Sequence, residues 1–169
     1  MATYYRYKRP ITNSGAITSE TMDVETWKAG STDTAALAFQ DTSGNIHDYS
    51  EFVLELNIVH NDVDGDEAGR DKTFGARMKR SYLGNKHTLT VKMVNHLQQI
   101  VAHQIFLLIR TTVDKTSFRV WYQSPCTSTY SACTSKEVYC ATINYGSQRY
   151  DRKTQKCYYD GMTFNLIEM

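Results

Sequence analysis

The chain has 169 residues and a formal net charge of +1, and 41% of its residues are hydrophobic. This length suits a single domain with a real core, and the small net charge gives no reason to expect nucleic acid or an anionic membrane as the main partner. The longest strongly apolar run, residues 105–109, is far shorter than the roughly 20 residues that cross a bilayer. The N-terminus lacks the apolar stretch of a secretory signal, so we expect folding in a cytosol.

Residues 1–45 are rich in Thr, Ser, Ala and Gly and show weak periodicity, which indicates an N-terminal extension or arm before a single domain of residues 46–169. The arm opens with Tyr4, Tyr5, Arg6 and Tyr7. Such a cluster could stack on single-stranded nucleic acid. We favour a contact with a neighbouring protein, because Tyr and Arg are enriched at protein interfaces and the net charge is small.

A strand is predicted next, since Phe52, Leu54, Leu56 and Ile58 alternate with mostly polar residues and should share one face. A second strand, in which Leu89, Val91 and Met93 alternate with polar residues, leads into an amphipathic helix over residues 95–109. Asn95 is its expected N-cap, with Gln98 three residues on.

An acidic turn follows the first strand and carries Asp62, Asp64 and Asp66. These aspartates occupy the first three ligand offsets of a calcium-binding EF-hand loop. Glu67 stands where that motif needs glycine, and Thr73 stands where it needs glutamate. The sequence therefore predicts a solvated turn and no calcium site.

Residues 62–86 are expected to form a long loop or hairpin, because glycines interrupt them and helical periodicity is weak. Basic residues follow the acidic turn: Arg70, Lys72, Arg77, Lys79 and Arg80. Two blocks of opposite charge would allow the basic part of one copy to meet the acidic part of the next.

Three more strands are predicted, over residues 118–122, residues 138–145 and the C-terminal stretch, with a polar segment over residues 146–156. In the C-terminal stretch Met162, Phe164 and Leu166 share one face, so we expect that strand to be paired and packed. The expected class is α+β, mainly β: an antiparallel β-sandwich flanked by one α-helix.

The four cysteines give no metal-binding pattern. Cys126, Cys133, Cys140 and Cys157 lack the close Cys-x-x-Cys pair of a zinc knuckle, and a cytosol keeps thiols reduced. We expect free thiols, no metal and no cofactor. The catalytic signatures of a serine nucleophile elbow, a zinc protease helix, a P-loop and a dinucleotide fold are also missing, so we expect no enzyme.

From about residue 54 onward, the order of several short motifs resembles a family of small tail-associated proteins from long-tailed bacteriophages of Gram-positive hosts. The matching pieces are Gly69-Arg70-Asp71, Leu83-Gly84-Asn85-Lys86-His87-Thr88-Leu89-Thr90-Val91, Phe118-Arg119-Val120-Trp121-Tyr122-Gln123-Ser124-Pro125 and Gly161-Met162-Thr163-Phe164-Asn165-Leu166-Ile167-Glu168. The chain departs from this family in its N-terminal extension and its cysteine-containing loop.

The resemblance implies a non-enzymatic virion protein of the tail or distal-tail ring (baseplate or tail-tube type), assembled in the host cytoplasm from copies of itself and other tail proteins. It implies no membrane partner and no catalytic residues. A neck or head-attached protein is one alternative. Another is a carbohydrate- or receptor-binding sandwich at the tail tip, with Trp27, Trp121 and Tyr130 as a sugar platform.

Overall fold

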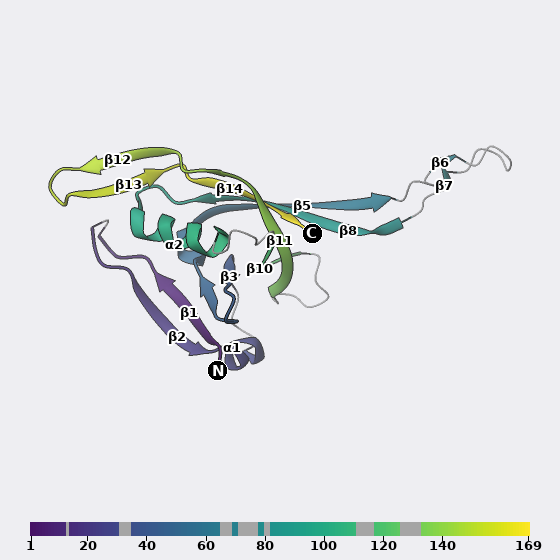
Figure 1. Cartoon of the computed structure of the whole chain (residues 1–169), viewed down its shortest axis with the longest axis horizontal. Coiled ribbons are helices and arrows are strands. Elements are labelled where there is room, and N and C mark those ends of the chain that lie inside the picture. Colours follow the sequence, from purple (N-terminus) through teal and green to yellow (C-terminus); the bar gives the residue numbers. More distant parts are fainter. Residues whose placement is uncertain are drawn as a thin grey trace.

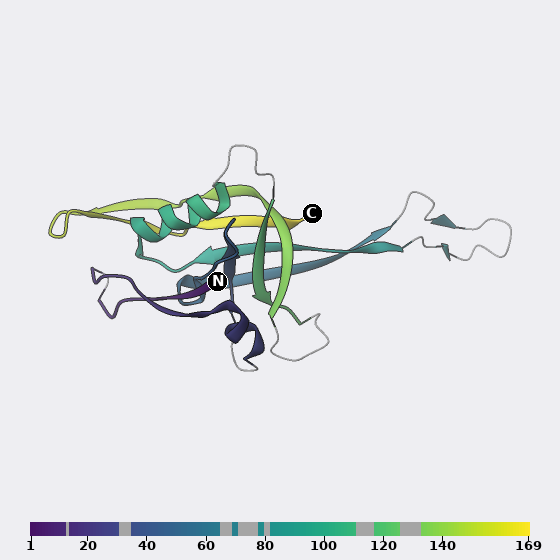
Figure 2. The same ribbon diagram turned by 60° about the horizontal axis from the view of Figure 1, so that its bottom comes forward.

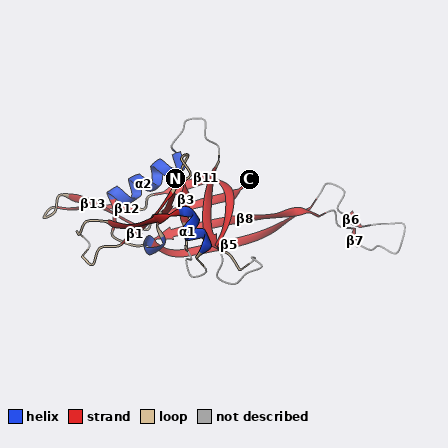
Figure 3. Cartoon of the chain, turned by 90° about the horizontal axis from the view of Figure 1, so that it is seen from below, coloured by secondary structure: helices blue, strands red, loops and turns tan. Residues whose placement is uncertain are grey.

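The computed structural model describes residues 1–12, 14–30, 35–64, 69–70, 78–79, 82–110, 117–125 and 133–169. For residues 62–64, 69–70, 78–79, 82–85 and 110 it describes the backbone alone. The described chain is mainly β with few helical residues, which confirms the α+β, mainly β class expected from the sequence (Figure 3).

One sheet of nine strands forms the body of the molecule (Figure 1). In spatial order its strands are β2 (Thr18–Asp23), β1 (Thr3–Lys8), β4 (Ile46–Asp48), β3 (Ala38–Gln40), β10 (Phe118–Gln123), β11 (Cys133–Asn144), β14 (Thr163–Glu168), β8 (Tyr82–Met93) and β5 (Val53–Asp64). Neighbouring strands run antiparallel except β1 and β4, which are parallel. The sheet has two different edge strands, β2 and β5.

The sheet curls so that strands distant in the hydrogen-bonding order face each other. The ring centroids of Phe39 on β3 and Phe164 on β14 are 6.2 Å apart, although β10 and β11 separate these strands in the sheet. Tyr122 on β10 likewise contacts His87 on β8. This curling encloses a core between two parts of one sheet, as in a sandwich.

Two hairpins reach out from the body in opposite directions (Figures 1 and 2). One is formed by β5 and β8, with β6 (Gly69–Arg70) and β7 (Met78–Lys79) beyond their ends. The other is formed by β12 (Ser147–Asp151) and β13 (Lys156–Asp160), and β9 (Leu97–Gln98) pairs with β13. The segment expected as a polar connection over residues 146–156 is therefore mostly strand and turn.

Gly146 marks the point where the second hairpin leaves the main sheet. Its φ is +70°, and a Cβ atom there would lie 2.0 Å from the carbonyl oxygen of Asp160. Only glycine fits such a left-handed, crowded position. The sharp turn of the hairpin away from the main sheet therefore depends on Gly146.

Helix α2 (Gln99–Arg110) begins later than the sequence indicated. The expected N-cap at Asn95 is wrong, because Leu97 and Gln98 pair with β13 and His96 has a φ of +56°. The buried stripe of the helix packs into the main core, with Val101 and Ile105 fully buried. No helix in the described part of the chain has the length and apolar character of a membrane span.

The main core joins α2 to strands β8, β10 and β14, none of which is an edge strand. The C-terminal strand behaves as its alternation predicted, since Met162, Phe164 and Leu166 are all buried. The described part of the expected acidic turn is strand, and Asp66 and Glu67 lie outside the described residues. Strand β5 continues through Asp62 and Asp64, whose backbones pair with β8.

Residues 1–45 are not the loosely structured arm that we expected. Strands β1, β2 and β3 belong to the nine-stranded sheet, and helix α1 (Val24–Ala29) packs beside them. A second, smaller core gathers there: Tyr4, Val24, Trp27, Ala35, Ala38 and Ile46. The pattern was hard to detect because β3 and β4 have only three residues each and β2 is mostly exposed. The 3₁₀ helix η1 (Ser50–Phe52) then leads into β5.

Candidate functional site

Tyr4 was expected at a subunit contact, but the structure buries it completely inside its own chain. Its ring stacks on Trp27 with centroids 4.7 Å apart, and its hydroxyl donates a hydrogen bond to Asp48. Burial, together with the neighbouring carboxylate, raises the pKa of Tyr4 well above its usual range. Tyr4 therefore holds the smaller core together and is not available to another protein.

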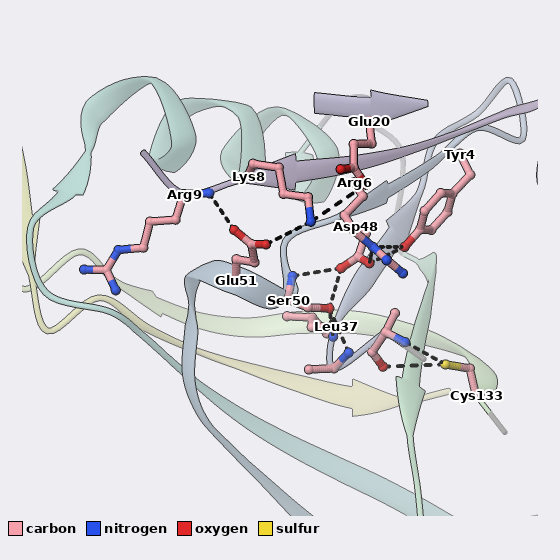
Figure 4. A network of polar contacts seen from close by, with 12 residues as sticks. Tyr4, Arg6, Lys8, Arg9, Glu20, Leu37, Asp48, Ser50, Glu51 and Cys133 are labelled. Carbon is pink, nitrogen blue, oxygen red and sulfur yellow. Dashed lines mark hydrogen bonds and ion pairs between the residues drawn. The ribbon is translucent and has the colours of Figure 1, made fainter. Parts of the chain in front are cut away.

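A buried polar group, which we call the Asp48 cluster, comprises Tyr4, Arg6, Asp48 and Ser50 (Figure 4). The carboxylate of Asp48 is fully buried and accepts bonds from the Tyr4 and Ser50 hydroxyls and, at 2.8 Å, from the Ser50 amide. The Arg6 Nε lies 3.4 Å from it. These contacts fasten β1 to β4, so the cluster is structural.

The basic residues next to this cluster are paired with acids on the same chain. Lys8 Nζ lies 3.2 Å from Glu51 and 3.7 Å from Glu20, and the Arg9 amide donates to Glu51 at 2.7 Å (Figure 4). Exposed pairs of this kind contribute only about 0–1 kcal/mol each. The start of the chain therefore presents partly neutralised charge.

A row of stacked rings runs from the partly exposed Tyr5 and Tyr7 on β1 and His47 on β4 to the buried Tyr49. Tyr5 stacks on His47 at 5.2 Å between centroids, and Tyr7 stacks on Tyr49 at 4.7 Å. The Tyr7 hydroxyl is 2.9 Å from His47 Nδ1, and His47 Nε2 is 3.0 Å from an Asp41 oxygen. Burial raises the pKa of Tyr7, which disfavours its use as a nucleophile or base.

A pocket of about 490 Å³ lies between the β1–β2 hairpin, the start of α2 and the turn that joins β12 to β13. We call it the β2–α2 pocket. Its lining combines apolar, amide and thiol side chains, including Ile17, Ser19, Ile100, Gln104, Lys156 and Cys157. Among the described lining residues Lys156 alone is formally charged, and its Nζ lies 3.3 Å from the Ser14 carbonyl. The pocket therefore suits an uncharged, largely apolar group.

A second buried polar group surrounds His87 on β8. One ring nitrogen contacts the Tyr122 hydroxyl, and the other lies 3.0 Å from His60 Nδ1. Glu168 accepts from the His87 amide at 2.7 Å and pairs with Lys136 at 2.8 Å. Burial lowers the pKa of His87. Within the described ranges, no group of three or more His, Cys, Asp or Glu side chains could hold a metal ion.

Much of the expected charged interface lies outside what the structure describes. Asp66, Lys72, Arg77 and Arg80 lie outside the described residues. For four more residues only the backbone is described: Asp62, Asp64, Arg70 and Lys79. Contact between the acidic and basic blocks of neighbouring copies stays a prediction.

The proposed sugar platform does not form from Trp27, which is 2% exposed and packs between Tyr4 and Trp121. Tyr130 and Cys126 lie outside the described residues. Cys133 and Cys157 are free thiols, and the Cys140 thiol lies 3.5 Å from the Thr142 carbonyl oxygen.

Leu54 on the edge strand β5 differs most from its expected position. Val53 pairs with Met93 and Glu55 with Lys92, so Leu54 is the extra residue of a β-bulge. It is 57% exposed, whereas simple alternation placed it on the core face with Leu56 and Ile58. A bulge redirects a side chain, and the amino-acid sequence around Leu54 gave no signal of one.

No protein family model, curated protein or solved structure matches this chain.

Proposed function

We propose that this chain is a non-enzymatic structural protein of a tailed bacteriophage particle, in the tail or distal-tail ring, and that it assembles from copies of itself. The observation that carries the proposal is the open nine-stranded sheet with two unlike edges, β2 and β5. In the described part of the chain, each of these strands pairs on one side only.

Both edges carry acidic residues, and β5 is interrupted by bulges, but two common devices against pairing with another chain are missing from them. Natural edge strands are commonly blunted by lysine or proline. Neither β2, with the sequence TSETMD, nor β5, with the sequence VLELNIVHNDVD, contains either residue. A contact between two different edges is head-to-tail, and repetition of such a contact closes a ring or extends a tube.

The virion part of the proposal is supported by the motif order described above, and the two long hairpins agree with it. Hairpins that extend beyond the body can reach neighbouring subunits without disturbing the core (Figure 2). The structure is also compatible with a neck or head-attached ring, which would use the same edges.

Sedimentation velocity and electron microscopy of the purified protein test the assembly. We expect discrete rings or short tubes, with a sedimentation coefficient that rises with protein concentration. A monomer at every concentration, up to that of a crowded cytosol, would contradict the proposal. Antibody labelling of particles that contain the chain would then place it in the tail, or reject that position.

A further inference from the structure

We propose that the β5 edge of one copy adds to the β2 edge of a second copy, and that Leu54 of the first copy enters the β2–α2 pocket of the second. This inference rests on the proposed self-assembly and specifies its interface. It assigns the pocket an occupant, which is an apolar side chain from an identical chain.

The pocket and the β2 edge are parts of one surface. Ser19 of β2 lines the pocket, and so do Ile17, just before β2, and Tyr7, the cross-strand partner of Ser19. When an extended segment adds to a sheet edge, main-chain hydrogen bonds provide affinity and pockets for alternate side chains provide specificity. An edge strand with a pocket beside it has both parts of such a site.

The chemistry of the pocket favours an uncharged aliphatic group. Ile17 and Ile100 supply apolar surface, and Lys156, the one formally charged residue of the lining, already contacts the Ser14 carbonyl. The other polar lining groups are neutral amides and hydroxyls, so a carboxylate or phosphate would find donors here but a single cationic partner among the described residues. The volume of about 490 Å³ accommodates an aliphatic side chain with part of its backbone.

Among the residues whose side chains the structure describes, Leu54 best meets the requirement. It is a large aliphatic residue, 57% exposed, on the other free edge of the same sheet. The bulge holds it away from its own core, so docking it would not disturb the fold of its own subunit. A bulge re-aims a side chain as a built feature of a strand, and here it presents an aliphatic side chain at the sheet edge.

Charge limits the register of this contact. Glu20 on β2 and Glu55 on β5 are both exposed. Like charges directly opposite each other destabilise a strand pair, so the register must keep these two glutamates apart. A single preferred register is what a specific interface requires.

Cys157 lines the pocket and is a free thiol, so a disulfide to Cys157 can report which residue enters the pocket. The substitution Leu54→Cys should therefore allow a disulfide between Cys157 of one copy and residue 54 of the next under mild oxidation with oxidised glutathione. A head-to-tail contact should give a ladder of covalent dimers, trimers and larger species on a non-reducing gel.

Two controls identify the pair of thiols. The double variant Leu54→Cys/Cys157→Ser should give no ladder, although Cys126, Cys133 and Cys140 are still present. Leu107→Cys is the control for position, because Leu107 has a similar exposure, 45%, but lies on α2 and outside the pocket lining. This variant should give no covalent ladder that depends on Cys157.

A second pair of variants does not depend on cysteine chemistry. Ile100→Lys places a charge in the pocket wall and should weaken self-association by about tenfold or more, measured by sedimentation. Leu107→Lys, on the same helix, should leave association unchanged. Circular dichroism and a thermal melt confirm that both variants fold.

The outcomes separate this inference from the proposed function. Rings or tubes without a Cys157-dependent ladder, or with normal assembly of Ile100→Lys, would overturn the interface and leave the structural role standing. A covalent product that stops at dimers would also overturn it, because a reciprocal contact ends at two chains. A protein that never assembles would overturn both.

Discussion

The two hydrophobic cores of this molecule are stabilised in different ways. The larger core is formed by α2 and long strands, and its centre consists of aliphatic and aromatic side chains such as Leu89, Ile105 and Phe164. The smaller core has fewer apolar residues and lies beside the fully buried carboxylate of Asp48. The larger core depends on close apolar packing, whereas a buried carboxylate depends on hydrogen-bond donors that offset its loss of hydration.

This difference predicts which part of the fold a substitution in each core should destabilise. Damage to the larger core should unfold the whole chain, because β10, β11 and β14 lie in the middle of the sheet and contribute to that core. Damage to the Asp48 cluster should loosen β1 and β2 first, since those strands are attached to the rest mainly through β4.

The largest effect is expected for Phe164→Ala in the larger core. Removing a buried phenylalanine side chain costs about 3–5 kcal/mol of unfolding free energy, because it leaves a cavity. Urea unfolding followed by circular dichroism measures the loss. Ile167→Ala, on the same strand but partly exposed, is the matched control and should cost clearly less. Equal losses would show that β14 is not packed as described.

Asp48→Ala tests the smaller core. It leaves the Tyr4 hydroxyl and the Ser50 amide without their acceptor, and an unsatisfied buried group costs about 1–3 kcal/mol. Hydrogen exchange should show faster exchange in β1 and β2 than in β8 and β14. Asp41→Ala, which removes a partly exposed carboxylate nearby, is the control. Uniform loss of protection would mean that the two cores unfold as one unit.

A smaller local effect is expected at the start of α1. The Asp23 carboxylate caps this helix by accepting from the amides of Glu25 at 3.1 Å and Thr26 at 3.3 Å. Asp23→Ala should cost about 1 kcal/mol, measured as a fall in the denaturant midpoint. Glu25→Ala removes a first-turn charge without removing the cap, so a loss as large as that of Asp23→Ala would argue against capping.

The smallest expected effect is a pH dependence of the unfolding free energy, which comes from His87 beside the larger core. Burial lowers the pKa of His87, while an unfolded histidine titrates near about pH 6.5. The unfolded chain therefore binds the extra proton first, so stability is full above about pH 6.5 and falls as the pH drops toward the lowered pKa.

Urea titrations between about pH 7.5 and about pH 5.5 measure this slope, and His87→Gln should make it shallower. The groups that face His87 are His60, Tyr122, Glu168 and Lys136. The pKa of Glu168 is lowered: burial opposes the shift, but hydrogen bonds from Lys136 and the His87 amide outweigh it, so Glu168 titrates below this window. His103→Gln, on the exposed side of α2, should leave the slope unchanged; an equal change there would contradict the assignment.

The amino-acid sequence predicts the larger core much better than the smaller one. The strand of Phe164 and the helix of Ile105 repeat apolar residues with clear periods, so both were found, with an error of a few residues at the start of the helix. The smaller core depends on a bond between Tyr4 and Asp48, which are 44 residues apart in the chain. No local pattern reports such a contact.

The candidate interface shows the same limit. Tyr4 was predicted to be on the surface because tyrosine suits interfaces, yet its neighbours bury it. Leu54 was predicted to be in the core because it continues an alternation, yet one bulge turns it outward. Burial is decided by the register of distant strands, and a shift of one residue changes the face to which a side chain belongs.

The position of β14 also has a consequence for how the chain reaches this fold. It follows every other strand in chain order, yet it lies inside the sheet between β11 and β8. As the chain is made, β5 and β8 can form their hairpin early, but β11 cannot join them until β14 has been synthesised. Contacts this distant in sequence slow folding, so the half-made protein exposes strand edges and depends on chaperones or dilution to avoid premature association.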